Sequence, residues 1–293
     1  HYAPEIFVGM KAYRTSEGHI QLFRPTENIK RMNISAERMC LPELDEELFL
    51  EALKKLVTVE QDWVPSEPFT SLYIRPFMFA SDEVMGIHTP QNCIFAIILS
   101  PVGSYFKEGV NPVKMYIEQE DVRAVRGGTG YAKCGGNYAG SLRAGEKAAS
   151  KGYAQVLWLD AIEKKYIEEG GGMNVMFKID GKVVTPALSS SVLAGITRKS
   201  LIEILKSWDV PVEERQISVD ELKDAMVAGK LEECWCCGTA AVLSPIGELA
   251  YGEEKFIIND FKTGPLAKRL YDELTGIQWG LKEDSFHWTT PVV

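Results

Sequence analysis

A run of glycines around a single lysine constrains this chain more than any other feature. Residues 127–144 read GGTGYAKCGGNYAGSLRA and hold one lysine, Lys133. Glycine tolerates positive φ and lets a backbone approach a ligand closely, so a lysine set among glycines can lie against a flat ligand. A sufficiently neutral lysine amine forms a Schiff base with an aldehyde cofactor. A glycine-rich loop with a solvated lysine fits these residues equally well.

The common phosphate-binding loops do not match this stretch. A Walker-type loop has Gly-Lys followed by Ser or Thr, whereas Lys133 lies between Ala132 and Cys134. The dinucleotide-binding pattern needs a third glycine where this chain has Lys133, although Gly128 and Gly130 fit.

Length and charge narrow the class of protein. The 293 residues allow one large domain or two smaller ones, and 45% of them are hydrophobic. A net charge of −9 argues against bulk binding of nucleic acid. We find no apolar run near the ~20 residues that span a bilayer and no signal-peptide pattern. The chain begins at His1, so we expect a processed or trimmed product, and a reducing cytoplasm is the simplest setting for its six cysteines.

The cysteines do not predict a disulfide framework or a metal site. Cys234, Cys236 and Cys237 are close together, but their spacing lacks a second Cys/His pair, and the four histidines are scattered. We expect a buried strand in which these thiols pack as apolar groups, and no metal.

The pattern of apolar residues predicts a mixed architecture. We expect strands within 5–25 around a Glu17-Gly18 turn, further strands at 70–79, 93–100, 113–117, 155–159 and 174–178, a strand at 233–243 broken at Gly238-Thr239, a Glu168–Gly172 turn, and helices at 46–58, 141–151, 197–208, 219–228 and 266–274. Strict βαβ alternation is missing, which indicates an α+β or mixed α/β fold. We expect a small domain at 1–100, a linker at 101–112 and a large domain at 113–293.

Four scattered features fit the needs of pyridoxal 5'-phosphate (PLP), namely a lysine, an acid for the ring nitrogen and a phosphate cup. They are Lys133, Glu169, the helix start at Gly195-Ile196-Thr197 and the Gly238-Thr239 break. Helix N-termini bind phosphate through backbone N–H groups. Taken singly, Glu169 fits a solvated loop acid and Thr197 an ordinary hydroxyl in a first helical turn.

Motifs along almost the whole chain resemble the branched-chain amino acid aminotransferases, which are PLP enzymes of fold type IV. The matching stretches include HYAPEIFVGMKAY, SLYIRPF, GGTGYAKCGGNYAGSL, EEGGGMN, LAGITRKS and CGTAAVLSP. The resemblance implies two domains: a small N-terminal α/β domain, truncated at its start, and a larger mixed pseudo-barrel. It also implies a homodimer.

The resemblance also implies roles for individual residues. Lys133 would form the internal aldimine and move the substrate's proton, and Glu169 would pair with the ring nitrogen. The other implied cofactor contacts are Tyr138, Arg31, Gly195, Ile196, Thr197 and Thr239. The implied substrate contacts are Phe7, Tyr73, Tyr105, Tyr138, Thr239, Ala240 and Arg75, with Arg75 taking the distal carboxylate of glutamate. Tyr2, Met85 and Ile87 match positions supplied across a dimer interface. Taken singly, Phe7, Tyr73 and Tyr105 fit core aromatics.

The chain departs from the family pattern at several points. Family members have a segment before the position of His1, so we expect part of the small domain to be missing. Val8 stands where relatives have Glu, and Gly172 where some carry a hydroxyl residue. The mammalian redox cysteine pair falls on Ala241 and Ser244, which favours a bacterial-type enzyme.

The sequence therefore predicts PLP-dependent transfer of the amino group of Leu, Ile or Val to 2-oxoglutarate. Two alternatives stay open. One is a D-amino-acid transaminase or an aminodeoxychorismate lyase of the same fold. The other is a catalytically silent binding protein of that fold, suggested by Val8 and the missing segment. The order of preference among Leu, Ile and Val does not follow from the residues.

Overall fold

The computed structural model describes residues 2–103 and 110–292, and these fall into two compact units. The first unit comprises His1–Tyr105, Ala132–Gly136 and Glu273–Val293, and the second comprises Phe106–Tyr131 and Asn137–Asp272. Two short segments from the later chain, one of which carries Lys133, thus belong with the N-terminal residues. The sequence-based domain boundaries stay a prediction.

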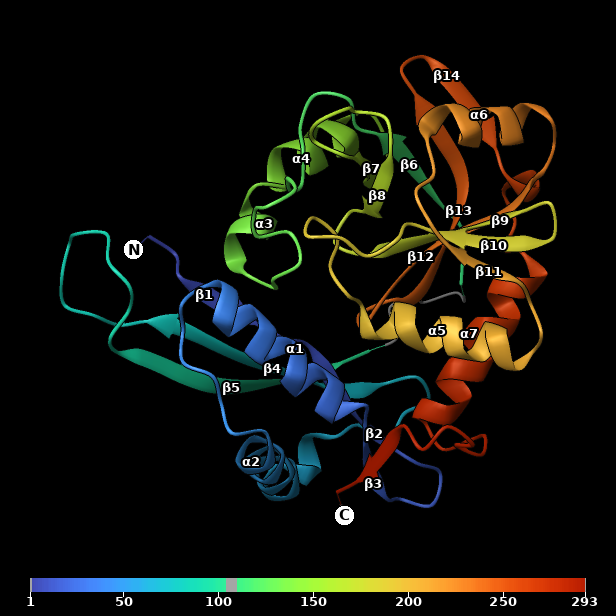
Figure 1. Cartoon of the computed structure of the whole chain (residues 1–293). Coiled ribbons are helices and arrows are strands. Elements are labelled where there is room, and N and C mark those ends of the chain that lie inside the picture. The colour runs from blue at the N-terminus through green and yellow to red at the C-terminus, as the bar shows by residue number, and fades with distance from the viewer. Residues whose placement is uncertain (1, 104–109, 293) are drawn as a thin grey trace. The chain divides into compact units, whose positions relative to one another are not determined.

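One six-stranded sheet forms the centre of the first unit. Its strands are β1 (Glu5–Phe7), β2 (Met10–Arg14), β3 (Ile20–Phe23), β4 (Ser71–Ala80), β5 (Cys93–Val102) and β15 (Thr289–Pro291). They lie in the order β1-β4-β2-β3-β15, and β5 pairs with β4 (Figure 1). The strands predicted within 5–25, 70–79 and 93–100 are confirmed.

Residues alternate between the two faces of this sheet. On β4 the side chains of Leu72 and Ile74 are fully buried in one apolar cluster. That cluster includes residues of α1 (Pro25–Arg38) and α2 (Glu46–Val59), followed by the short helix η1 (Gln61–Trp63). Because successive side chains of a strand point to opposite faces, Tyr73 and Arg75 lie on the face away from that core. The helices therefore cover one face and leave the other for a site.

A nine-stranded mixed sheet forms the second unit. Its strands are β6 (Val113–Ile117), β7 (Gln155–Leu159), β8 (Ile167–Gly170), β9 (Asn174–Ile179), β10 (Lys182–Thr185), β11 (Val212–Glu214), β12 (Leu231–Gly238), β13 (Val242–Tyr251) and β14 (Glu254–Ile257). The order is β11-β10-β9-β12-β13-β6-β7-β8, with β14 on β13 (Figure 1). Among these described strands, only the pairs β6·β7, β6·β13 and β10·β11 are parallel. The predicted mixed α/β fold is confirmed.

Some of the remaining helices were predicted from the sequence, and these begin and end close to their predicted positions. They are α3 (Gly135–Ala139), α4 (Leu142–Ser150), α5 (Ile196–Ser207), α6 (Val219–Val227), α7 (Pro265–Gln278) and the short η2 (Asn259–Phe261). Apolar periodicity predicted only part of α7, and it predicted neither α3 nor the two short helices. The structure describes no helix that is long and apolar enough to cross a membrane.

Two sequence predictions were wrong in detail. Glu168 and Glu169 were assigned to a turn, but both lie in strand β8, and the turn begins at Gly171, whose φ is +56°. The segment 233–243 is not one broken strand but the hairpin of β12 and β13. The buried thiols are confirmed: Cys236 and Cys237 lie inside β12, and burial raises the pKa of the Cys237 thiol to about 12.

Candidate active site

The backbone of Lys133 is held by sheet-like and helical contacts in the first unit. The Phe7 N–H donates to the Lys133 carbonyl at 3.0 Å, and Ile6 forms a β-bridge with Cys134. On its other side, the Lys133 N–H donates to Ser35 Oγ on α1 at 2.9 Å. The lysine therefore occupies a fixed position in the fold, which contrasts with the solvated-loop interpretation.

Two glycines of the lysine motif lie close to other parts of the chain. A Cβ on Gly135 would lie 2.7 Å from Glu5 Oε2, and one on Gly130 would lie 2.5 Å from the Ser191 Cα. Real Cβ atoms are not found at such distances from a backbone atom, so Gly130 in particular cannot be replaced without a shift. Gly130 thus serves close packing of the motif rather than flexibility.

Two cations of the first unit lie over the ring of Phe7. The Lys133 Nζ is 4.8 Å and the Arg75 Cζ 4.7 Å from its centroid. Arg75 also lies 5.2 Å from the centroid of the Tyr73 ring and donates from Nη2 to the Tyr73 hydroxyl at 2.8 Å. Ring quadrupoles attract cations in this geometry. The structure thus brings together Phe7, Tyr73, Arg75 and Lys133.

Arg75 has no acidic partner among the residues that the structure describes. Its Nε is buried and makes no hydrogen bond there. A half-buried guanidinium without a carboxylate is costly, and aromatic rings offset only part of that cost. The side chain is therefore suited to receive a carboxylate from a ligand.

The neighbouring strand β2 adds a second buried cation. Lys11 lies opposite Tyr73 in the register of β2 and β4, so both side chains leave the same face of the sheet. Lys11 is only 7% exposed, and burial lowers the pKa of its amine to about 8. Just before it, Gly9 makes room for Tyr73, because a Cβ there would lie 2.0 Å from the Tyr73 hydroxyl. Sequence reasoning missed Lys11.

Arg31 connects through Ser35 to the lysine motif. Arg31 is on α1, 8% exposed, and donates to Asn28 Oδ1 at 3.4 Å. Its carbonyl accepts from Ser35 Oγ at 3.0 Å, the same hydroxyl that receives the Lys133 N–H. Ser35, which sequence reasoning missed, therefore links Arg31 to Lys133.

Val8 is fully buried in the apolar cluster on the other face of the sheet.

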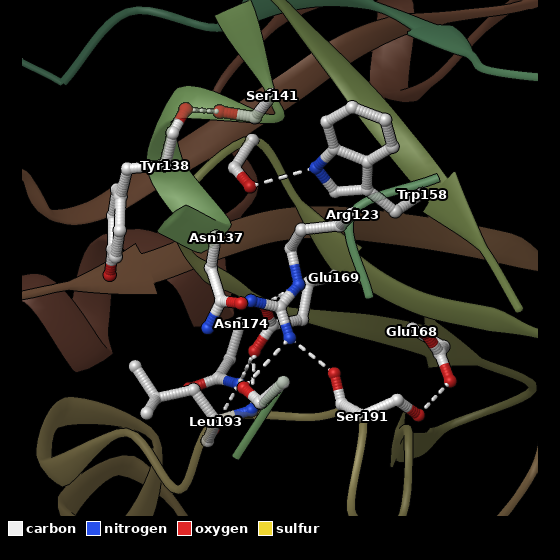
Figure 2. Close-up of polar contacts among 12 residues, drawn as sticks. Arg123, Asn137, Tyr138, Ser141, Trp158, Glu168, Glu169, Asn174, Ser191 and Leu193 are labelled. Carbon is white, nitrogen blue, oxygen red and sulfur yellow. Dashed lines mark hydrogen bonds and ion pairs between the residues drawn. The ribbon is translucent and has the colours of Figure 1, made fainter. Parts of the chain in front are cut away.

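Glu169 lies at the centre of a polar network in the second unit (Figure 2). The residue is 3% exposed. Its Oε2 forms an ion pair with Arg123 Nε at 2.6 Å, and its Oε1 accepts from Asn174 Nδ2 at 3.1 Å and from the Leu193 N–H at 2.9 Å. Arg123 and Asn174 were not predicted from the sequence. Together they hold a buried carboxylate in a single orientation.

The same Asn174 connects the acid to the start of α5. Its Nδ2 also donates to the Leu193 carbonyl at 2.9 Å, and its Oδ1 lies so close to Gly195 that a Cβ there would be 2.0 Å away. Gly195 is the N-cap of α5 and has an extended backbone, and no described side chain caps the helix. Ile196 and Thr197 form its buried first turn. These N–H groups can bind an anion such as a phosphate.

Tyr138 and the β12–β13 turn complete the predicted set in the second unit. Tyr138 lies on α3, and its Cε1 would be 3.5 Å from a Cβ added to Gly172, which is an ordinary contact. Reciprocal bonds of 2.8 Å between the Asn137 side chain and Thr129 fix the start of α3. Thr239 and Ala240 lie in the turn of the hairpin.

The other predicted residues are exposed or lie outside the described part. Tyr2, Met85 and Ile87 are 56%, 84% and 83% exposed. Tyr105 lies outside the described residues.

Residues 6–249 match the model of the family described as amino-transferase class IV. The chain belongs to this family. The class IV aminotransferase is 53% identical over 292 residues to branched-chain-amino-acid aminotransferase 2 of Bacillus subtilis (strain 168), a match that covers 100% of this chain and 80% of the relative. It is also 53% identical to branched-chain-amino-acid transaminase 1 of the same organism, with 100% and 82% covered.

Solved structures agree with this assignment. The aminotransferase superposes on the Escherichia coli branched-chain amino acid aminotransferase with a TM-score of 0.84 at 28% identity, covering 100% of this chain and 91% of the other. The branched-chain aminotransferase from the thermophilic archaeon Thermoproteus uzoniensis with norvaline matches with a TM-score of 0.82 at 25% identity, covering 99% and 90%. The predicted family and the fold of type IV are confirmed.

Proposed function

We propose that this aminotransferase moves the amino group of branched-chain L-amino acids to 2-oxoglutarate with PLP as cofactor. The observation that carries the substrate assignment is the shared Phe7 ring, over which both Lys133 and Arg75 lie. A reactive amine and a cation without an acidic partner among the described residues thus flank one aromatic wall. That arrangement suits a substrate that reacts at one end and is either apolar or acidic at the other.

The residues present fit PLP. When bound, the cofactor supplies an aldehyde for the amine and a ring that acts as an electron sink. Lys133 would hold it covalently, and Tyr138 would hydrogen-bond its phenolic oxygen. Arg31, Gly195, Ile196, Thr197 and Thr239 would bind its phosphate. The observation behind this fit is the N-terminus of α5, which no described side chain caps and which Asn174 ties to Glu169.

Glu169 would pair with the cofactor's ring nitrogen and keep a proton there. Its carboxylate is fixed by two hydrogen bonds and by the ion pair with Arg123. Lys133 Nζ would take the proton from the substrate's Cα and pass it to C4′ of the cofactor, and in the second half of the reaction it would move a proton back along the same path.

Arg75 lets one pocket accept two kinds of side chain. With leucine, isoleucine or valine, the rings of Phe7 and Tyr73 supply apolar contact, and the Tyr73 hydroxyl and the rings stabilise the guanidinium. With glutamate, the guanidinium forms a charge-assisted pair with the distal carboxylate. The amides of Thr239 and Ala240 would bind the α-carboxylate, and Tyr105 and Tyr138 would complete the walls.

We also propose a homodimer and a cytoplasmic location. Tyr2, Met85 and Ile87 are large and strongly exposed, which supports their assignment to a partner's pocket. The proposed domains are 1–100 and 113–293, joined by 101–112.

An amino-donor panel assayed with 2-oxoglutarate tests this function. We expect visible absorbance from the bound cofactor that shifts on addition of L-leucine, and turnover with L-Leu, L-Ile and L-Val. Turnover with D-amino acids alone would favour a D-amino-acid transaminase, and release of pyruvate from aminodeoxychorismate would favour the lyase. A protein without the visible band would favour the silent binding protein.

A further inference from the structure

Adjacent glutamates on β8 face different surroundings. Glu169 points into the network with Arg123 and Asn174, whereas Glu168 lines a cavity of about 280 Å³ elsewhere in the second unit. Neighbouring residues of a strand point to opposite faces, which explains the division. The cavity is also lined by Arg126, Asp160, Tyr166, Leu188, Ser189 and Gln216.

Glu168 is poorly satisfied for a buried acid. The residue is 7% exposed, and its Oε1 accepts a hydrogen bond from Ser191 Oγ. Its Oε2 is buried, and the described residues offer it neither a hydrogen bond nor an ion pair. Burial raises the pKa of the Glu168 carboxyl, although the Ser191 hydrogen bond, Arg123 and Arg126 oppose that shift. Burying such a side chain costs free energy that a single hydrogen bond offsets only in part.

Asp160, in the same cavity, shows what a structural acid looks like here. Its two oxygens accept four backbone N–H groups, from Ile162, Glu163, Lys165 and Tyr166, at 2.7–3.2 Å. That carboxylate closes a turn, and its partners account for its burial. Glu168 lies inside a strand and has a single donor in the described part of the chain, so its role has to be sought in what that donor does.

The donor, Ser191, leads directly to the active-site acid (Figure 2). The Ser191 carbonyl accepts a hydrogen bond from Arg123 Nη2, and Arg123 Nε forms the ion pair with Glu169. Gly130 supplies a second carbonyl to the same Nη2 at 3.1 Å. The hydroxyl of Ser191 is thus held by Glu168 while its carbonyl holds Arg123.

We propose that Glu168 is a positioning residue of the active site that acts through Ser191 on Arg123. The hydrogen bond to Glu168 fixes the Ser191 segment, the segment fixes the guanidinium, and the guanidinium partly neutralises Glu169. Loss of the anchor loosens Arg123 and leaves Glu169 more negative towards the group it holds. This inference rests on the proposed role of Glu169 towards the ring nitrogen of PLP.

Two uncharged substitutions separate the hydrogen bond from the charge. Glu168→Gln keeps an oxygen that accepts from Ser191 Oγ, and Glu168→Leu removes it. The readout is the pH midpoint of the cofactor's visible absorbance in the holoenzyme without substrate. A more negative Glu169 stabilises protonated cofactor, so we expect the midpoint of the Leu variant to lie above that of the Gln variant by about 0.5–1 pH unit. Equal midpoints in the two variants would overturn the proposal.

A double-mutant cycle with Ser191→Ala adds a second test that does not depend on the Leu variant alone. Ser191→Ala should raise the midpoint by itself, and Glu168→Leu should add little in that background. Full additivity of the two shifts contradicts a path through Ser191.

Glu233→Gln is the matched control. Glu233 is a buried glutamate of the same unit whose carboxylate caps α7 through the Leu266 and Ala267 N–H groups, at 3.1 and 2.8 Å. Its substitution should lower the melting temperature of the apoprotein and leave the midpoint unchanged. A midpoint shift equal to that of Glu168→Leu would reduce Glu168 to a structural role. Absence of the visible band from the wild-type protein, by contrast, would overturn the proposed function itself.

Discussion

The two groups of candidate site residues satisfy their charges in opposite ways. The Phe7 region of the first unit (Phe7, Lys11, Tyr73, Arg75, Lys133) holds its cations against aromatic rings and in a buried strand. The Glu169 network of the second unit (Arg123, Glu169, Asn174, Ser191, Leu193) pairs its charges with one another.

This difference separates recognition from scaffolding. A cation that has no acidic partner among the described residues, such as Arg75, gains most when a ligand carboxylate arrives. A carboxylate that is already paired, such as Glu169, gives a fixed field for the cofactor. We therefore expect substitutions of Lys133 and Arg75 in the Phe7 region to change activity more than stability, and substitutions in the Glu169 network to change both.

The largest effect is expected for Lys133→Ala. The variant loses both the covalent anchor of the cofactor and the group that moves the proton, so kcat should fall by about 10⁴-fold or more. The backbone bonds of Lys133 to Phe7 and Ser35 do not need its side chain, so the free energy of unfolding should stay within about 1 kcal/mol. Visible absorbance, turnover and urea unfolding measure these effects, and turnover within tenfold of wild type would refute the assignment.

Glu169→Gln should combine a catalytic and a structural loss. The amide cannot neutralise Arg123 or a protonated ring nitrogen, so single-turnover proton abstraction should slow by about 10²-fold. Breaking one buried ion pair should also cost about 3 kcal/mol of stability. Unchanged proton abstraction would show that the acid is structural only, and unchanged stability would show that the network is not the scaffold described here.

Lys11→Met tests the cost of a buried amine in the Phe7 region. Its folded-state pKa of about 8 is below the unfolded value, so the wild-type protein should gain stability as pH rises from about 8 to about 10.5. The substitution should remove this gain and raise stability at pH 7 by about 1–3 kcal/mol. Urea unfolding at pH 7 and pH 10 on both proteins measures it. If the free energy of unfolding changed with pH equally in the two proteins, the charged Lys11 amine would carry no cost to stability.

The smallest effects concern two glycines of the Glu169 side. Gly172→Ser places a Cβ 3.5 Å from the Tyr138 ring, so we expect activity within about threefold of wild type. Gly195→Ala, the matched change, would force Asn174 away from Glu169 and should cost about 1–2 kcal/mol. Thermal unfolding and steady-state rates are measured for both variants. Equal losses of stability and activity in the two would contradict the role given to Asn174.

The sequence predicted those elements whose apolar residues follow a clear period. Helix α2 is an example, with buried Phe49, Leu53 and Val57 and an Asp45 cap. Helix α1 was missed because its buried face includes polar residues such as Arg31, and no described side chain caps its start. Strand β8 was taken for a turn because its two glutamates precede three glycines. Both are buried by contacts that form only in the fold, such as those of Glu169 with Arg123 and of Glu168 with Ser191.

The candidate site shows the same limit. The glycine run and the needs of PLP pointed to Lys133 and Glu169, and motif resemblance supplied Arg75; the roles of all three stay predictions. Arg123 and Ser191 could not be found, since their partners lie elsewhere in the chain and their own neighbours carry no distinctive pattern. Asn174 follows its partner Glu169 closely, but the glycines between them give no sign of that contact. Pairing across a folded network is a tertiary property.

Two half-reactions of Arg75→Met, one with L-leucine and one with L-glutamate, test the central claim most directly. The claim is that Arg75 recognises the distal carboxylate and that leucine does not need it. Each half-reaction is followed by the cofactor spectrum. The catalytic efficiency with glutamate should fall by the equivalent of about 2–4 kcal/mol, while the catalytic efficiency with leucine should change little. Equal losses on both substrates would show that Arg75 only holds strand β4, and that glutamate is recognised by other residues.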